Sequence, residues 1–117
     1  MDRLRKRADF LRAAKGVRRV AGAVTLEVCR TPDGAPDTVR VGFTASRKIG
    51  NAVTRNRAKR RLRAVASRLL PLLGRGGHDY VLVARATTGT RAFDALLADV
   101  TAAIHAAHKR LEAEDKT

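Results

Sequence analysis

The stretch from Ser46 to Ala64, SRKIGNAVTRNRAKRRLRA, holds eight Lys or Arg residues and no acidic residue. A helix that begins near Arg55 would place five apolar side chains within an arc of roughly 100°. These are Ala58, Leu62, Val65, Ala66 and Leu69. The cations would fan across the rest of the surface, with Arg55 at the border of the arc. The stretch therefore predicts an amphipathic helix over about 52–70, with one face on a core and the other positively charged.

The ends of this helix carry their own signals. Asn51 or Thr54 can cap its first turn, because a short polar side chain accepts a hydrogen bond from a free backbone amide. Pro71 and the glycine-rich GRGG that follows it, residues 74–77, predict the end of the helix before the next strand.

Three other segments read as strands. Apolar residues alternate with polar ones over 24–29 and over 39–44, which predicts two half-buried strands. The Pro, Asp and Gly residues of RTPDGAPD, 30–37, lie between them and favour a turn, so we expect a hairpin. The nearly continuous apolar run DYVLVARA, 79–86, predicts a strand covered on both faces.

Two further helices complete the expected fold. Apolar residues recur at helical spacing after Phe93 and predict a C-terminal helix over about 91–112. They are Leu96, Leu97, Val100, Ile104, Ala107 and Leu111. A shorter helix over about 8–15 would end at Gly16. The 117 residues suffice for one domain, so we expect a single α+β domain over 1–117.

The charge balance points to a polyanionic partner. The chain has 25 Lys and Arg against 11 Asp and Glu, a net charge of +14, and 44% hydrophobic residues, enough for a core. Residues 1–78 hold 20 basic and 5 acidic residues, so the partner is expected to bind this part. Like charges on a small body repel one another, and nucleic acid is the partner that most often offsets such repulsion.

The basic helix itself strengthens this expectation. Solvated helix faces usually mix Glu with Lys, whereas Arg55 and Lys59, Lys59 and Arg63, and Arg57 and Arg61 are all like-charged pairs four residues apart. Such a face is unfavourable unless phosphates neutralise it. Arginine predominates, and its planar fork suits phosphate oxygens and stacking on bases.

The sequence offers no catalytic constellation and no metal site. His105 and His108 are three apart without a third ligand and are expected to face solvent, and Asp94 and Asp99 do not share a helix face. A nuclease needs clustered carboxylates for a metal ion or a positioned acid and base.

The N-terminus has basic residues but lacks the apolar core of a signal peptide, so we expect a soluble, cytoplasmic protein without a membrane partner.

The segment SRKIGNAVTRNRAKRRLR, 46–63, resembles the signature of the bacterial ribonuclease P protein subunit. The segments RLRKRADF, 3–10, and DYVLVAR, 79–85, resemble the opening and the last strand of that family. The resemblance implies a two-layer α/β sandwich with a mixed sheet. In it, the basic segment joins two neighbouring parallel strands by a left-handed crossover, where general rules favour a right-handed one.

The resemblance also implies a function. The protein would assist a catalytic RNA that, with Mg²⁺ bound mainly by the RNA, removes the 5′ leader of precursor transfer RNA; the protein need not oligomerise. From the matching positions of the family motif, the resemblance implies that the RNA subunit would be contacted by Lys48, Arg55, Asn56, Arg57, Lys59, Arg60 and Arg63. Phe10, Arg47 and Lys48 would contact the leader, with Phe10 lining a cleft between the first helix and the sheet.

Two departures from the family concern the leader. Ala14 stands where relatives often have a second aromatic, and Glu27 and aliphatic residues occupy the first strand where relatives often have another. Aromatic residues make up 3% of the chain, so base stacking is expected to be weak and charge to contribute more. Core packing of Phe10 is the alternative to leader contact.

A small basic ribosomal RNA-binding protein without enzymatic role is the alternative function. It shares the composition, and only the ordered motif over 46–63 separates the two. A helix-turn-helix protein is disfavoured by the strand signals and by the lack of a helix just before the basic one. A self-sufficient ribonuclease is disfavoured by the missing acid and base.

Overall fold

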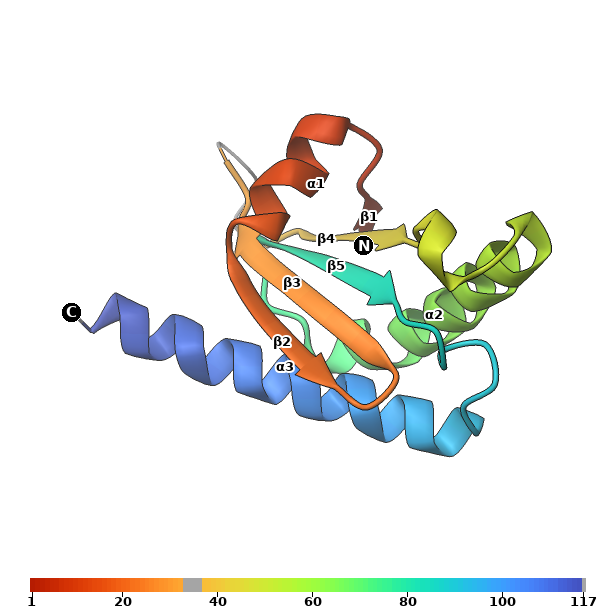
Figure 1. Cartoon of the computed structure of the whole chain (residues 1–117). Helices are drawn as coiled ribbons and strands as arrows, with labels where there is room; N and C mark the ends of the chain where they lie inside the picture. The colour runs from red at the N-terminus through yellow and green to blue at the C-terminus, as the bar shows by residue number, and fades with distance from the viewer. Residues whose placement is uncertain (33–36, 117) are drawn as a thin grey trace.

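A computed structural model describes residues 1–32 and 37–116. It contains a five-stranded mixed sheet in the order β1-β4-β5-β3-β2, three α-helices and one 3₁₀ turn (Figure 1). In chain order the elements are β1 (Asp2–Arg3), α1 (Arg7–Ala14), β2 (Val17–Ala21), β3 (Val24–Arg30), β4 (Val39–Thr44), η1 (Arg47–Ile49), α2 (Ala52–Leu73), β5 (His78–Ala84) and α3 (Phe93–Asp115). The expectation of an α+β fold is confirmed.

The central strand is β5, which pairs in parallel with β4 and antiparallel with β3. Tyr80, Val81 and Leu82 are at most 1% exposed, so the prediction of a strand covered on both faces is confirmed. The predicted hairpin of the strands at 24–29 and 39–44 is wrong, because β5 lies between them. A strand that is apolar on both faces reaches full burial only with neighbours on both sides. Of the turn predicted over 30–37, residues 33–36 lie outside the described residues.

The hairpin that does form joins β2 to β3, with Ala21 opposite Val24. Gly22 turns the chain with a φ of 51°, a left-handed conformation that glycine adopts at little cost. Adjacent Arg18 and Arg19 break the apolar alternation in β2, so sequence reasoning missed this strand, and it also missed the two-residue β1.

The main core lies between the sheet and helices α2 and α3. Leu62, Val65 and Ala66 of α2 are buried, as predicted, but Leu70 reaches the core more fully than Leu69, which is half-buried. From α3, the fully buried side chains are Leu96, Val100 and Ile104. The helices lie along one face of the sheet, while α1 lies over one end of the other face (Figure 1).

Helix α2 runs through Pro71 to Leu73 instead of ending at the proline, which is a correction to the predicted stop. The amide of Gly74 closes the last turn by donating to the Leu70 carbonyl at 2.8 Å. A proline so near the end interrupts the amide pairing at one position only, and the next turn of helix remains closed. Helix α3 likewise continues to Asp115, three residues beyond the expected end.

Helix α1 is attached by a small apolar cluster and by an ion network. Leu4, Ala13 and Val81 form the cluster, with Phe10 packed against it. Arg40 of β4 donates to both carboxylate oxygens of the buried Asp79 at 2.7 Å and to Asp9 of α1 at 3.1 Å. The hydrogen bond from Arg12, at 2.9 Å, is the main cause that lowers the pKa of Asp9. The network therefore fixes α1 to the sheet.

His108 is buried, against the expectation that it faces solvent; His105 is exposed, as expected. The Nε2 atom of His108 lies 2.7 Å from the hydroxyl of Tyr80, and that hydroxyl accepts a hydrogen bond from the Arg75 amide at 2.9 Å. Burial disfavours the imidazolium and lowers the pKa of His108 to about 4.

Within the described ranges, no helix is long and apolar enough to cross a membrane.

We expect His108 to make stability fall as the pH falls from about 6.5 to about 4. In this pH window His108 is protonated in the unfolded chain and neutral in the folded chain. The free energy of unfolding therefore falls by roughly 3 kcal/mol over the full pKa shift. His108→Gln, which can still accept from Tyr80, should remove this part of the pH dependence. Urea unfolding at pH 7, 5.5 and 4.5 measures it, with His105→Gln as the exposed control. An unchanged slope in His108→Gln would contradict the assignment.

Candidate nucleic-acid interface

The turn into α2 explains the KIGN part of the motif. Gly50 has a φ of 144°, and a Cβ there would lie 2.9 Å from the Cβ of Thr54, so a side chain is excluded by conformation and by space. Asn51 follows as the N-cap, and its side-chain oxygen accepts from the Thr54 amide at 3.0 Å. The predicted cap at Asn51 is confirmed. These two features fix the orientation of the first turn of α2 relative to the 3₁₀ turn.

The exposed face of α2 carries most of the predicted RNA-contact residues. Asn56, Arg57, Arg60 and Arg63 are exposed, while Arg55 and Lys59 are half-buried at the border. Val53 is 78% exposed and joins Asn56, Arg60 and Arg63 around a shallow hollow of about 310 Å³. The Nε atom of Arg55 is buried without a hydrogen-bond partner among the described residues. The structure thus brings these six residues onto one surface, as predicted.

Among the described residues, no ion pair compensates the positive charge of this surface. None of the ion pairs in ranges 1–32 and 37–116 involves the cations Lys48, Arg55, Arg57, Lys59, Arg60 or Arg63. Helix α3 behaves differently, since Arg110 pairs with Glu114 at 3.3 Å one turn away. Because like charges four residues apart destabilise a helix, an anionic ligand on α2 would relieve a standing repulsion.

Arg61 is the exception on α2. It is half-buried and donates one hydrogen bond to the carbonyl of Thr88 at 2.6 Å and another to the carbonyl of Arg91. Sequence reasoning placed it among the fanned cations, but the structure places it against the segment that joins β5 to α3. Its charge is used for a contact within the protein.

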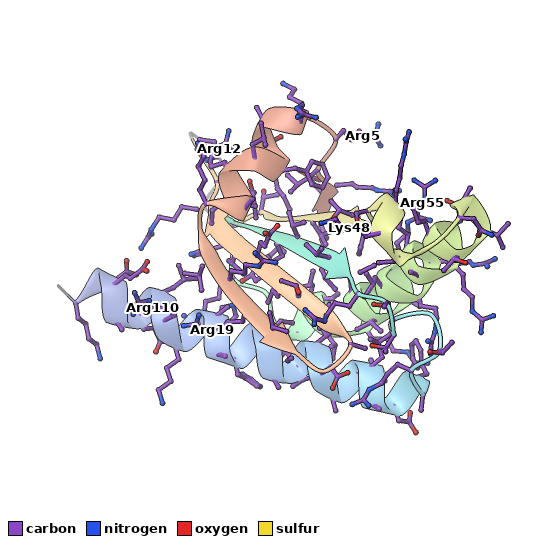
Figure 2. The ribbon with its side chains drawn as sticks, viewed as in Figure 1. Arg5, Arg12, Arg19, Lys48, Arg55 and Arg110 are labelled. Carbon is purple, nitrogen blue, oxygen red and sulfur yellow. The ribbon has the colours of Figure 1, made fainter. Side chains whose placement is uncertain are left out.

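The predicted leader residues lie on α1 and η1, on either side of β4 in the chain. The ring of Phe10 covers Gly42, where an added Cβ would come within 2.6 Å of the Cε1 atom, and Phe10 is half-buried. Arg47 and Lys48 follow the end of β4 and are exposed on η1. Figure 2 shows Lys48 and Arg55 toward one end of the molecule and Arg110 toward the other. Phe10 therefore keeps both a packing role and an accessible edge.

Lys48 shares a hollow with a second cation, Arg85, which sequence reasoning missed. A hollow of about 350 Å³ is lined by Ser46, Lys48, Ile49, Arg85, Ala86 and Thr87. It lies beyond the carboxyl ends of the parallel strands β4 and β5, the edge where ligands commonly bind in parallel sheets. Arg85 comes directly after β5, and that position was the signal that could have identified it.

The sheet face beside α1 offers few means of stacking. Apart from Phe10, the aromatic side chains are Phe43, Tyr80 and Phe93, and all three belong to the main core. Glu27 of β3 is half-buried on the face that carries α1, and burial raises the pKa of its carboxyl. Glu27, where relatives often have an aromatic residue, therefore places a carboxyl beside Arg18. The positive charge of Arg18 lowers the pKa of Glu27 and partly opposes the effect of burial.

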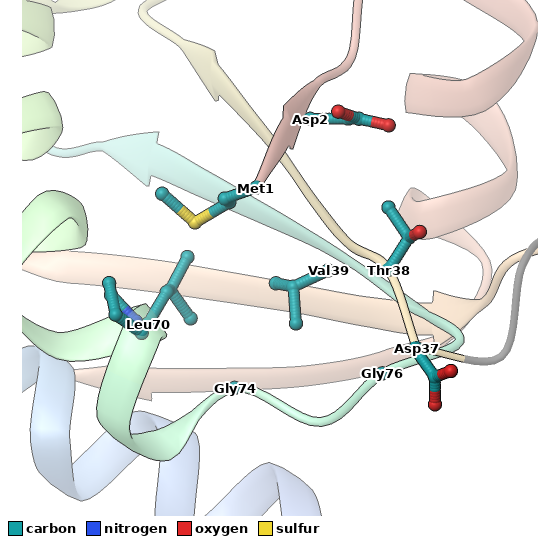
Figure 3. A pocket seen from close by; sticks show the side chains of 9 residues that line it. Met1, Asp2, Asp37, Thr38, Val39, Leu70, Gly74 and Gly76 are labelled. Atoms are coloured by element: carbon teal, nitrogen blue, oxygen red, sulfur yellow. The ribbon is translucent and has the colours of Figure 1, made fainter.

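A third hollow, of about 450 Å³, lies away from the basic surface (Figure 3). It is lined by Met1, Asp2, Asp37, Thr38, Val39, Leu70, Pro71, Gly74 and Gly76. Since its lining includes two acidic side chains and no Lys or Arg, we exclude it from the nucleic-acid interface. Among the described residues, no group of three or more His, Cys, Asp or Glu side chains lies close enough to hold a metal ion.

Comparisons with known proteins identify the family of the chain. The model of the Ribonuclease P family matches residues 1–108. The Ribonuclease P protein component of Caulobacter vibrioides is 56% identical over 103 residues, which span 88% of this chain and 68% of the relative. That of Ruegeria pomeroyi is 50% identical over 106 residues, 90% of this chain and 85% of the relative.

Solved structures of the family share the fold. The RNase P protein of Staphylococcus aureus superposes with a TM-score of 0.74 at 25% identity, covering 92% of this chain and 95% of that one. The RNase P protein of Thermotoga maritima gives a TM-score of 0.73 at 25% identity, covering 89% and 96%. With the motif, the sheet order and these relatives in agreement, the chain belongs to the Ribonuclease P protein family.

Proposed function

We propose that this chain binds the RNA subunit of ribonuclease P through the exposed face of α2 and assists removal of the 5′ leader from precursor transfer RNA. The observation that carries the proposal is the uncompensated positive face of α2, with Asn56, Arg57, Arg60 and Arg63 exposed on it. Arginine forks bind phosphate oxygens in pairs, and each contact releases counterions from the RNA. Lys48 and the half-buried Arg55 and Lys59 extend this contact.

The leader of precursor transfer RNA is proposed to run from Phe10 of α1, whose ring lies over Gly42 of β4, to Arg47 and Lys48 just after the end of β4. Phe10 supplies one aromatic edge, and the two cations supply phosphate contacts. With so few aromatics on this face, charge contributes most of the affinity for the leader. Arg85, across the hollow from Lys48, is well placed to add a further contact.

The chemistry is assigned to the RNA partner. Mg²⁺ prefers oxygen ligands, whereas the interface described above presents Lys and Arg, so this interface does not fit a magnesium site. The protein contributes by neutralising phosphates and positioning the substrate in the cytoplasm, without a need to oligomerise. A ribosomal RNA-binding protein would share these electrostatics, but the family match over residues 1–108 favours ribonuclease P.

The first test is cleavage. We expect purified, RNA-free protein to leave precursor transfer RNA intact, because the interface in the described part of the chain presents no acid and base positioned for hydrolysis. Added to a transcribed bacterial ribonuclease P RNA, it should raise the rate of 5′ processing at Mg²⁺ concentrations where the RNA alone is slow. Gel assays of leader release measure both. Sustained 5′ processing by the protein alone would contradict the proposal.

The second test concerns α2. Arg57→Ala and Arg60→Ala should weaken binding to the same RNA while the melting temperature stays unchanged, because both side chains are exposed. Each should also lower the salt slope of binding by about 0.7 to 0.9 for each phosphate that the variant no longer neutralises. Filter binding at several salt concentrations measures this. Arg110→Ala, on the exposed side of α3, is the matched control. Normal binding by both α2 variants would show that the basic face is only solvated and does not contact RNA.

The third test concerns Phe10. Phe10→Ala should lower affinity for precursor transfer RNA with a leader and barely change affinity for mature transfer RNA, both measured in complex with the RNA subunit. Removing the aromatic partner of one stacked base costs roughly 1 to 3 kcal/mol. Truncation of a buried Phe costs about 3 to 5 kcal/mol of stability, and since Phe10 is half-buried, the stability loss should be smaller.

Substrates of increasing leader length separate the two roles of Phe10. Gly42→Ala offers a second variant, since its Cβ would displace the ring without deleting it. A large loss of melting temperature with no dependence on leader length would assign Phe10 to packing alone.

A further inference from the structure

Arg61 lies on the basic helix but is hydrogen-bonded to a different part of the chain. Its two terminal nitrogens donate to the carbonyls of Thr88 and Arg91, 27 and 30 residues away in the sequence. The guanidinium is planar and its donors point in fixed directions, so it can bridge two carbonyls at once. The contact therefore joins α2 to the segment 85–92 between β5 and α3.

That segment is anchored from its other side as well. The hydroxyl of Thr88, a fully buried residue, donates to the Ala23 carbonyl at 2.6 Å and accepts from the Arg85 amide at 2.8 Å. Arg91 donates twice to Asp99 of α3, at 3.0 and 3.1 Å, and Asp99 also accepts from the Ala23 amide at 3.0 Å. These contacts hold the segment to the β2–β3 turn and to α3, and Arg61 is its link to α2.

The same segment carries one wall of the hollow that faces Lys48. Arg85, Ala86 and Thr87 line it, and the amide of Arg85 is bonded to the Thr88 hydroxyl that anchors the segment. Arg85 is held by β5, which ends one residue earlier, by its guanidinium, which donates to the Thr25 hydroxyl at 3.4 Å, and by the Thr88 hydroxyl. Arg61 ties the same segment to α2. Because RNA is a stiff array of phosphates, cations held at fixed spacing bind it with a smaller ordering cost.

We propose that Arg61 is a positioning residue: it braces segment 85–92 against α2 so that Arg85 and the exposed face of α2 bind RNA as one preorganised surface. The inference rests on the proposed RNA-binding function. It assigns Arg61 a role distinct from that of Arg57 and Arg60, although all three belong to the same basic run.

The test uses Arg61→Lys, which keeps the charge and removes the fork. A lysine ammonium is a compact charge that cannot reproduce two divergent donors. Arg68→Lys is the matched control, because Arg68 is an exposed arginine of the same helix that lies over the ring of Phe93 at 5.2 Å.

The first arm needs no RNA. Hydrogen exchange of the amides in 85–92 should speed up in Arg61→Lys, since Thr88, Thr90 and Arg91 donate amide bonds within this segment. Arg68→Lys should leave their exchange as in the wild type. Unchanged exchange in Arg61→Lys overturns the brace, whatever RNA the protein binds.

The second arm measures binding of a transcribed bacterial ribonuclease P RNA. Arg61→Lys should weaken binding about tenfold, and Arg85→Ala should cost much less in the Arg61→Lys background than alone, because the two act as one unit. Additive losses, or normal binding by Arg61→Lys, overturn the positioning role. If the wild type itself fails to bind, the proposed function and the RNA-binding role of Arg61 fail together, while the exchange arm still decides the brace.

Discussion

The parallel pairing of β4 with β5 is the constraint on which the rest of the structure depends. Parallel neighbours cannot be joined by a tight turn, so the chain between Thr44 and His78 must return across the sheet. Helix α2 makes this return, and its apolar side, with Leu62 and Val65, closes the main core. The basic run is consequently held on a rigid element, with its charged side outward. The same pairing brings the ends of β4 and β5 together, so Lys48 and Arg85 line one hollow.

The arginines of this chain divide into two groups by what they contact. Arg40 and Arg91 pair with the buried carboxylates Asp79 and Asp99, and they join elements of the fold to one another. A buried carboxylate without such a partner would be costly, which is why each is matched by a fork of donors. The cations of α2 have no such partners among the described residues. Their repulsion is a cost that the apolar side of the helix offsets and that a phosphate backbone would remove.

The face that carries α1 is the one proposed to bind the leader, and it holds few aromatic side chains. Phe10 is fixed over Gly42 by close packing, and α1 is fixed by Arg40, so this part of the surface is preorganised. Around it, Ala14 and Glu27 provide neither a ring nor a positive charge. Stacking is therefore concentrated at one position, whereas cations are plentiful on η1 and α2. Under the proposed function, such a balance would make affinity for the leader more sensitive to salt than on a surface rich in aromatics.

Local patterns in the sequence determined the helices, the cap at Asn51, the burial of β5 and the charged side of α2, because each depends on residues within a few turns. The order of strands was decided only by the tertiary structure. Two alternating segments can pair with each other or with a third strand, and the choice depends on how all strands and helices pack together. The interior position of His108 depends on Tyr80, and the inward turn of Arg61 depends on carbonyls that are distant in the sequence. No local periodicity encodes such contacts, since long-range packing and hydrogen bonding decide which polar side chain on a helix is used within the fold and which is left for a ligand.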